Sequence, residues 1–163
     1  LGSVNIPGDR IVAQLGNGAG LFASIGDSAD DIIINGASLS KTIDVIANDS
    51  AEAVAAKINA VTGETKVSAE AKTFAHLYSS YATDETYSVK INNVTTGQFA
   101  ISNGNVADAV DKINAISGST GVTAQATTDN KVRLQSLAGA NILVENESTG
   151  TNLRVQSVGH DGE

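Results

Sequence analysis

The side chains that could carry chemistry in this 163-residue chain are few and scattered. There are two histidines and no cysteine, which excludes disulfides, thiolate metal sites and cysteine nucleophiles. His76 stands opposite Ala75 and Leu77 on an expected strand, which predicts an ordinary surface residue, and His160 lies in a tail that is expected to fray. A catalytic triad would need a serine on a G-x-S-x-G turn, and the sequence has none. We therefore expect no enzymatic activity and no catalytic residue.

Three further segments match a ligand-binding pattern only in part. Gly16–Gly20 is rich in glycine, but a nucleotide-binding loop would need another glycine where Leu21 stands. Asp27–Asp31 could supply oxygen ligands to Ca²⁺, although its spacing is not that of an EF-hand. Glu145 and Glu147 alternate as they would on the solvent-exposed face of a strand. A glycosidase pair would need a third element to bring the two carboxylates together, and we see none in the sequence. We expect no cofactor and no metal.

Composition narrows the class of protein further. The net charge is −8, which disfavours nucleic acids and anionic membrane surfaces as partners. No apolar run approaches the roughly 18 residues of a membrane span. The apolar residues are mainly small or β-branched, with three Tyr, three Phe and no Trp. Such side chains favour thin sheets packed against short helices.

An internal repeat organises the sequence. Three segments recur in the same order at shifts of 57, 55 and 55 residues: Ile34-Asn35-Gly36 with Ile91-Asn92-Asn93, Lys57-Ile58-Asn59-Ala60 with Lys112-Ile113-Asn114-Ala115, and Val67–Ala71 with Val122–Ala126. One short match would be chance, but three ordered matches at nearly constant spacing indicate two copies of one unit.

Each copy is expected to begin with a β-hairpin. Ile32–Ile34 pairs with Thr42–Ile46 in the first copy, and Tyr87–Ile91 pairs with Gln98–Ile101 in the second. The hairpin loops are expected to be longer than the tightest kind.

A helix follows each expected hairpin. It starts behind a polar cap, at Asp49–Glu52 in the first copy and at Asn103–Asn105 in the second. Gly63 and Gly118 are placed to end the two helices in the left-handed conformation. The apolar residues that share one helix face are Val54, Ile58 and Val61 in the first copy, and Val106, Val110 and Ile113 in the second.

Strands are expected again after each helix. Val67 to Leu77 alternates as one long strand, and the second copy forms a hairpin around Thr128–Lys131 followed by a strand at Ile142–Glu145. The first copy is expected to have a looser segment in place of that hairpin, with Phe74, His76, Tyr78 and Tyr81. The predicted fold class is α+β and β-rich, with a lead-in at 1–25, a first module at 26–84 and a second module with closing strands at 85–163.

These repeated residues resemble the IN motif of bacterial flagellins and of the flagellar hook-associated cap protein. In that motif an Ile-Asn strand-turn precedes an Ala-rich helix that ends in Ile-Asn-Ala and is followed by Gly-Val-Thr-Ala. The structural signature comprises Ile34, Asn35, Gly36, Ile58, Asn59, Ile91, Asn92, Ile113 and Asn114.

The resemblance implies a structural, non-catalytic domain on the outside of a flagellar filament, exported without a cleavable signal peptide. Its partners would be other copies of the subunit, through flanking segments that this sequence does not contain, with glycans as a further possibility. Two alternatives stay open. The modules could belong to the cap or hook-associated protein, or they could form a surface glycan-binding module.

Overall fold

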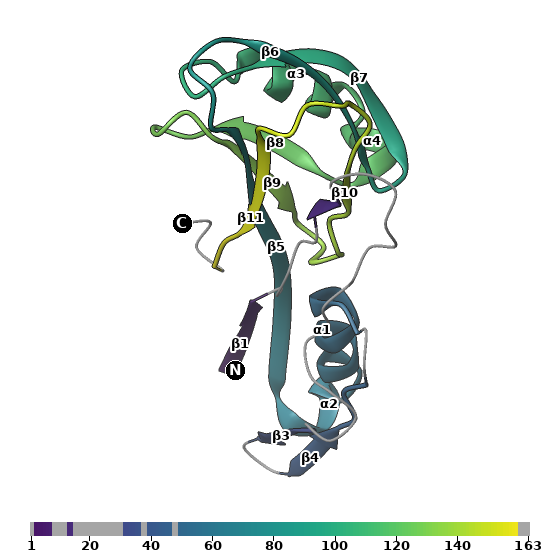
Figure 1. Cartoon of the computed structure of the whole chain (residues 1–163). Coiled ribbons are helices and arrows are strands. Elements are labelled where there is room, and N and C mark those ends of the chain that lie inside the picture. Colours follow the sequence, from purple (N-terminus) through teal and green to yellow (C-terminus); the bar gives the residue numbers. More distant parts are fainter. Residues whose placement is uncertain (1, 8–12, 15–30, 37–38, 47–48, 160–163) are drawn as a thin grey trace.

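The computed structural model describes residues 2–7, 13–14, 31–36, 39–46 and 49–159. Two groups of elements lie at the two ends of one long strand, β5 (Val67–Ser79), as Figure 1 shows. The class is α+β and rich in strands, with short helices and mainly antiparallel sheets, as predicted. No helix in the described ranges is long and apolar enough to cross a membrane.

The first group contains the hairpin β3 (Ile32–Asn35) and β4 (Ser40–Ile43), helix α1 (Ala51–Ala60) and the short helix α2 (Thr62–Thr65). Ser50 caps the start of helix α1, because its side-chain oxygen accepts a hydrogen bond from Ala53 N at 3.1 Å. Such a cap satisfies one of the backbone donors that every helix start leaves free. Helix α1 packs on the first half of β5.

The second group repeats this order of hairpin, helix and strand. Its hairpin is β6 (Glu85–Ile91) and β7 (Val94–Ile101), followed by α3 (Ala107–Ala115), α4 (Ser117–Thr120) and the strand β8 (Thr123–Ala126). The strands β9 (Val132–Ser136), β10 (Val144–Asn146) and β11 (Leu153–Ser157) complete it. Helix α3 packs against β7 and β8.

Strand β5 organises the largest sheet because it has partners on both edges. Its first half pairs in parallel with β1 (Gly2–Pro7), and its second half pairs antiparallel with β9 on one edge and β11 on the other. Strand β8 extends this sheet beyond β9. A second sheet has the order β2 (Ala13–Gln14), β10, β6, β7.

Two hydrophobic clusters lie along this framework. The first is built around Ile58 of α1 and Ile34 of β3, and the second around Ile113 of α3 and Ile91 of β6. Ile58, Ile91 and Ile113 have no exposed surface. Burying side chains of this size removes apolar surface from water at a gain of roughly 25 cal/mol per Å².

The structure corrects three local predictions. The β6–β7 loop has only two residues, because Asn92 and Asn93 both take positive φ, as a tight primed turn requires. Gly63 and Gly118 lie inside α2 and α4, so the left-handed positions fall at Lys66 and Gly121.

The segment expected to be loose in the first copy is also regular. Phe74, His76 and Tyr78 belong to β5 and pair with β9 and β11, so that the strand runs unbroken to Ser79. Strand β5 is longer than the repeat pattern indicates, because it pairs with strands that lie far away in the sequence.

Candidate functional site

Each long helix is fastened to the strand that follows it by one asparagine. Asn59 donates from Nδ2 to Ala69 O at 2.9 Å and accepts from Ala69 N at 2.8 Å. Asn114 makes the same two bonds to Ala124, at 2.9 Å and 2.8 Å. An amide side chain can satisfy a strand's backbone donor and acceptor together, as a neighbouring strand would. We call these contacts the asparagine clamps.

The chain turns from helix to strand around a buried threonine in both copies. Thr65 donates to Val61 O at 3.1 Å and accepts from Val67 N at 3.2 Å. Thr120 donates to Ile116 O at 3.2 Å and accepts from Val122 N at 3.1 Å. Each hydroxyl therefore serves as the partner of backbone groups that the helix end leaves without one.

Sequence reasoning missed both threonines as part of the signature. They were nevertheless detectable, because Thr65 and Thr120 stand 55 residues apart, like the asparagines of the clamps.

The hairpin turns contact the same two threonines. Gly36 lies so close to Thr65 that an added Cβ would stand 2.2 Å from the Thr65 carbonyl oxygen. Asn92 donates to Thr120 O at 2.9 Å and accepts from Leu143 N at 2.9 Å. Asn35 differs from Asn92, since its side chain accepts from Ser40 Oγ at 2.8 Å within its own hairpin. In each copy the hairpin turn thus contacts the threonine that follows the long helix.

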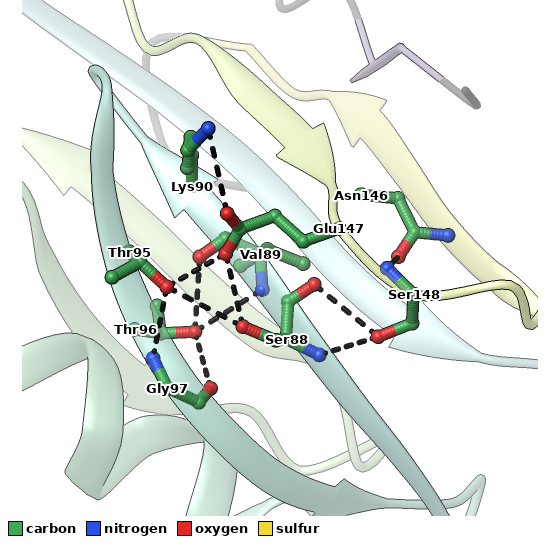
Figure 2. Close-up of polar contacts among 9 residues, drawn as sticks. All are labelled: Ser88, Val89, Lys90, Thr95, Thr96, Gly97, Asn146, Glu147 and Ser148. Carbon is green, nitrogen blue, oxygen red and sulfur yellow. Dashed lines mark hydrogen bonds and ion pairs between the residues drawn. The ribbon is translucent and has the colours of Figure 1, made fainter. Parts of the chain in front are cut away.

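Glu147 forms a second polar cluster, which Figure 2 shows beside the β6–β7 hairpin. It accepts hydrogen bonds from Thr95 at 2.6 Å and Ser88 at 3.0 Å, and it forms an ion pair with Lys90 at 3.4 Å. Next to it, Ser148 Oγ accepts from Ser88 N at 2.8 Å. The hydrogen bond from Thr95 is the main cause that lowers the pKa of Glu147, and the bonds from Ser88 and Lys90 lower it further. This cluster ties the segment after β10 to the hairpin.

Among the described residues, His76 of β5 and Glu145 of β10 lie in different sheets. Glu147 follows the end of β10, and its carboxylate accepts hydrogen bonds from Thr95 and Ser88 of the hairpin. In the described residues, no group of three or more His, Asp or Glu side chains could hold a metal ion. His160, the Gly16–Gly20 loop and residues 27–30 lie outside the described residues.

The structure places His76 in a different environment from the predicted one. The prediction of a surface residue is wrong, because only 7% of its surface is exposed. The reason is that β9 and β11 flank β5 on both edges at this point, with Arg133 and Gln156 as the cross-strand neighbours of His76.

The elements that carry the first clamp define a known motif. Residues 31–77 match the flagellin hook IN motif. The matched region runs from β3 through α1 and α2 to Leu77 in β5. No curated protein matches the chain. The IN motif agrees with the resemblance inferred from the residues. It contains Asn59 of the first clamp, and it contains Gly36 and Thr65, which lie against each other.

Proposed function

We propose that this chain is a non-catalytic structural domain on the outer surface of a flagellin-type filament. The observation that carries the proposal is the match of residues 31–77 to the flagellin hook IN motif. Its partners are other copies of the same subunit, joined through segments that flank this domain. Its place is the extracellular flagellum, reached without a cleaved signal peptide.

The contacts within the domain support a structural role. Two partly buried contacts of the IN motif use polar side chains to bond to the chain's own backbone. Both clamp bonds of Asn59 end on Ala69, and the Thr65 hydroxyl bonds to Val61 and Val67. Groups used in this way stabilise one conformation and are not free to bind a substrate. A net charge of −8 would also keep neighbouring filaments apart in the medium.

The proposal includes a second copy of the motif beyond the matched region. Asn114 and Thr120 repeat the bonds of Asn59 and Thr65 with the same donors and acceptors. We assign residues 26–84 to the first module and 85–163 to the second, with 1–25 leading in. Two modules in series would project further from a filament than one.

Immunogold electron microscopy of intact flagellated cells tests the proposal, with antibodies raised against the purified chain. We expect gold along the whole filament shaft. Serum absorbed beforehand with the purified chain is the control and should give no label. Gold confined to filament tips would replace the proposal with the cap-protein alternative. Filaments without gold would contradict both readings.

A further inference from the structure

A row of polar side chains crosses the outer face of the large sheet. The strand registers place Gln125 of β8 beside Arg133 of β9, Arg133 beside His76 of β5, and His76 beside Gln156 of β11. Cross-strand partners project from the same face of a sheet. The opposite face carries Ala75, Leu77, Val132 and Leu134, all buried in the second hydrophobic cluster. The four polar residues therefore point away from the core.

A groove of about 520 Å³ lies over His76, Arg133 and Gln156 of this row. Its polar lining includes His76, Thr127, Asp129, Lys131, Arg133 and Gln156. Small-molecule sites fall in the range of roughly 300–1,000 Å³ and combine a few convergent polar groups. The groove is large enough for a ligand the size of one sugar.

His76 is an unusual lining residue for such a groove, because it is almost fully buried. Its side chain is more than nine-tenths buried, and Nε2 has no hydrogen-bond partner in the described structure. A buried polar atom without a partner costs roughly 1–3 kcal/mol. Nε2 itself has almost no accessible surface, so His76 contributes one side of the groove and not a ligand contact at this atom.

The charges in the groove favour an anion. Lys131 forms an ion pair with Asp129 at 2.7 Å, and this contact is the main cause that lowers the pKa of Asp129 to about 2. These two charges offset each other. Arg133 donates to the neutral Gln125 side chain at 2.5 Å, and no acid in the described residues forms an ion pair with it. A guanidinium has five donors in a planar fork that matches a carboxylate.

We propose that this groove binds a hydroxylated carboxylate, such as an acidic sugar. Arg133 holds the carboxylate, the exposed Gln156 amide bonds to the ligand's hydroxyl groups, and His76 forms part of the groove wall against which the ligand lies. The site lies outside the IN-motif region except for His76, and binding here is independent of the filament role.

Titration of the ¹⁵N-labelled chain with glucuronate, followed by NMR, tests the site. Glucose is the matched probe, because it has the same ring without the carboxylate. We expect saturable shifts at His76, Arg133 and Gln156 with glucuronate up to about 50 mM, an affinity in the millimolar range. Glucose should give no saturable shift.

Substitutions then separate the site from general charge effects. Arg133→Gln should weaken glucuronate binding by about tenfold, since a hydrogen bond to a charged group is lost. Arg154→Gln removes the same charge from β11 outside the groove lining and should leave binding unchanged. Gln156→Ala, on an exposed position, should weaken binding without affecting the fold.

Three results would overturn the proposal: no saturable shift with glucuronate, equal binding of inorganic sulfate, or equal losses in the two arginine variants. None of these results bears on the immunogold pattern, so this proposal and the filament role fail separately.

Discussion

Asn59 and Asn114 each replace a strand partner with a single side chain. Both residues are exposed on their helices, yet each supplies the donor and the acceptor that one alanine of the next strand needs. Aspartate could only accept and lysine could only donate, so an amide is required at this position. This requirement explains why Ile-Asn-Ala recurs at the end of both helices.

The first prediction concerns these clamps. Asn59→Ala and Asn114→Ala should each lower the free energy of unfolding by about 1–2 kcal/mol, because two bonds to backbone groups are lost. Chemical denaturation of the two variants measures the loss. Lys112→Ala, an exposed change on the same helix as Asn114, is the control and should be nearly neutral. A wild-type-like midpoint for both asparagine variants would refute the clamp.

The second prediction concerns Gly36. An added Cβ would meet Thr65 backbone atoms at 2.2–2.7 Å, and the backbone cannot move aside as a side chain can. Gly36→Ala should therefore destabilise the protein by about 1–3 kcal/mol through overpacking. Gly63→Ala is the matched control, since nothing lies within 4 Å of its Cβ position, and it should be neutral or slightly stabilising. Thermal unfolding compares them, and equal effects would contradict the close contact.

At the scale of elements, Glu147 joins the segment after β10 to the β6–β7 hairpin. The pKa of its carboxyl is lowered from the ordinary value of 4.5, chiefly by the hydrogen bond from Thr95. A folded pKa below the unfolded one means that the stabilisation is complete above pH 4.5. It is lost as the pH falls through the folded pKa.

The third prediction follows from this sign. Stability measured by denaturant titration should fall below pH 4.5, and Glu147→Gln should make that fall less steep. Thr95→Val should also make the loss of stability below pH 4.5 less steep, since this substitution removes the main hydrogen bond to the carboxylate. An unchanged acid-side slope in Glu147→Gln would show that the cluster contributes nothing to linkage.

Elements with local signals were predictable from the sequence. The alternation of Val67 to Leu77 indicated β5, and the spacing of Val54 and Ile58 indicated a buried face of α1, both of which the structure confirms. The tight turn at Asn92 and Asn93 was not predicted, because asparagine tolerates positive φ without requiring it. A glycine at either position would have indicated such a turn.

Contacts between distant segments were not predictable. His76 is buried because β11, almost 80 residues later, occupies one edge of its strand. The Glu147 cluster likewise joins residues separated by 52 and 59 positions. Neither pairing leaves a periodic signal in a single sequence, since strand order is set by the whole fold.

In the molecule as a whole, the elements that carry the two hydrophobic clusters lie along β5 (Figure 1). The first cluster includes Ala69 and Ala71 from this strand, and the second includes Ala75 and Leu77. One continuous strand thus contributes side chains to both clusters.

The fourth prediction tests whether the clusters respond separately. Ile58→Ala and Ile113→Ala should each cost about 2–5 kcal/mol, since both side chains are fully buried. Amide hydrogen exchange should rise in α1 for the first variant and in α3 for the second. A rise in both helices with either variant would mean that the two clusters unfold as one unit.

Electron cryo-microscopy of the intact filament would show where this domain lies. We expect, on the outside of every subunit along the shaft, density for two α+β modules joined by the long strand β5. A shaft whose outer density cannot accommodate these modules would contradict this expectation.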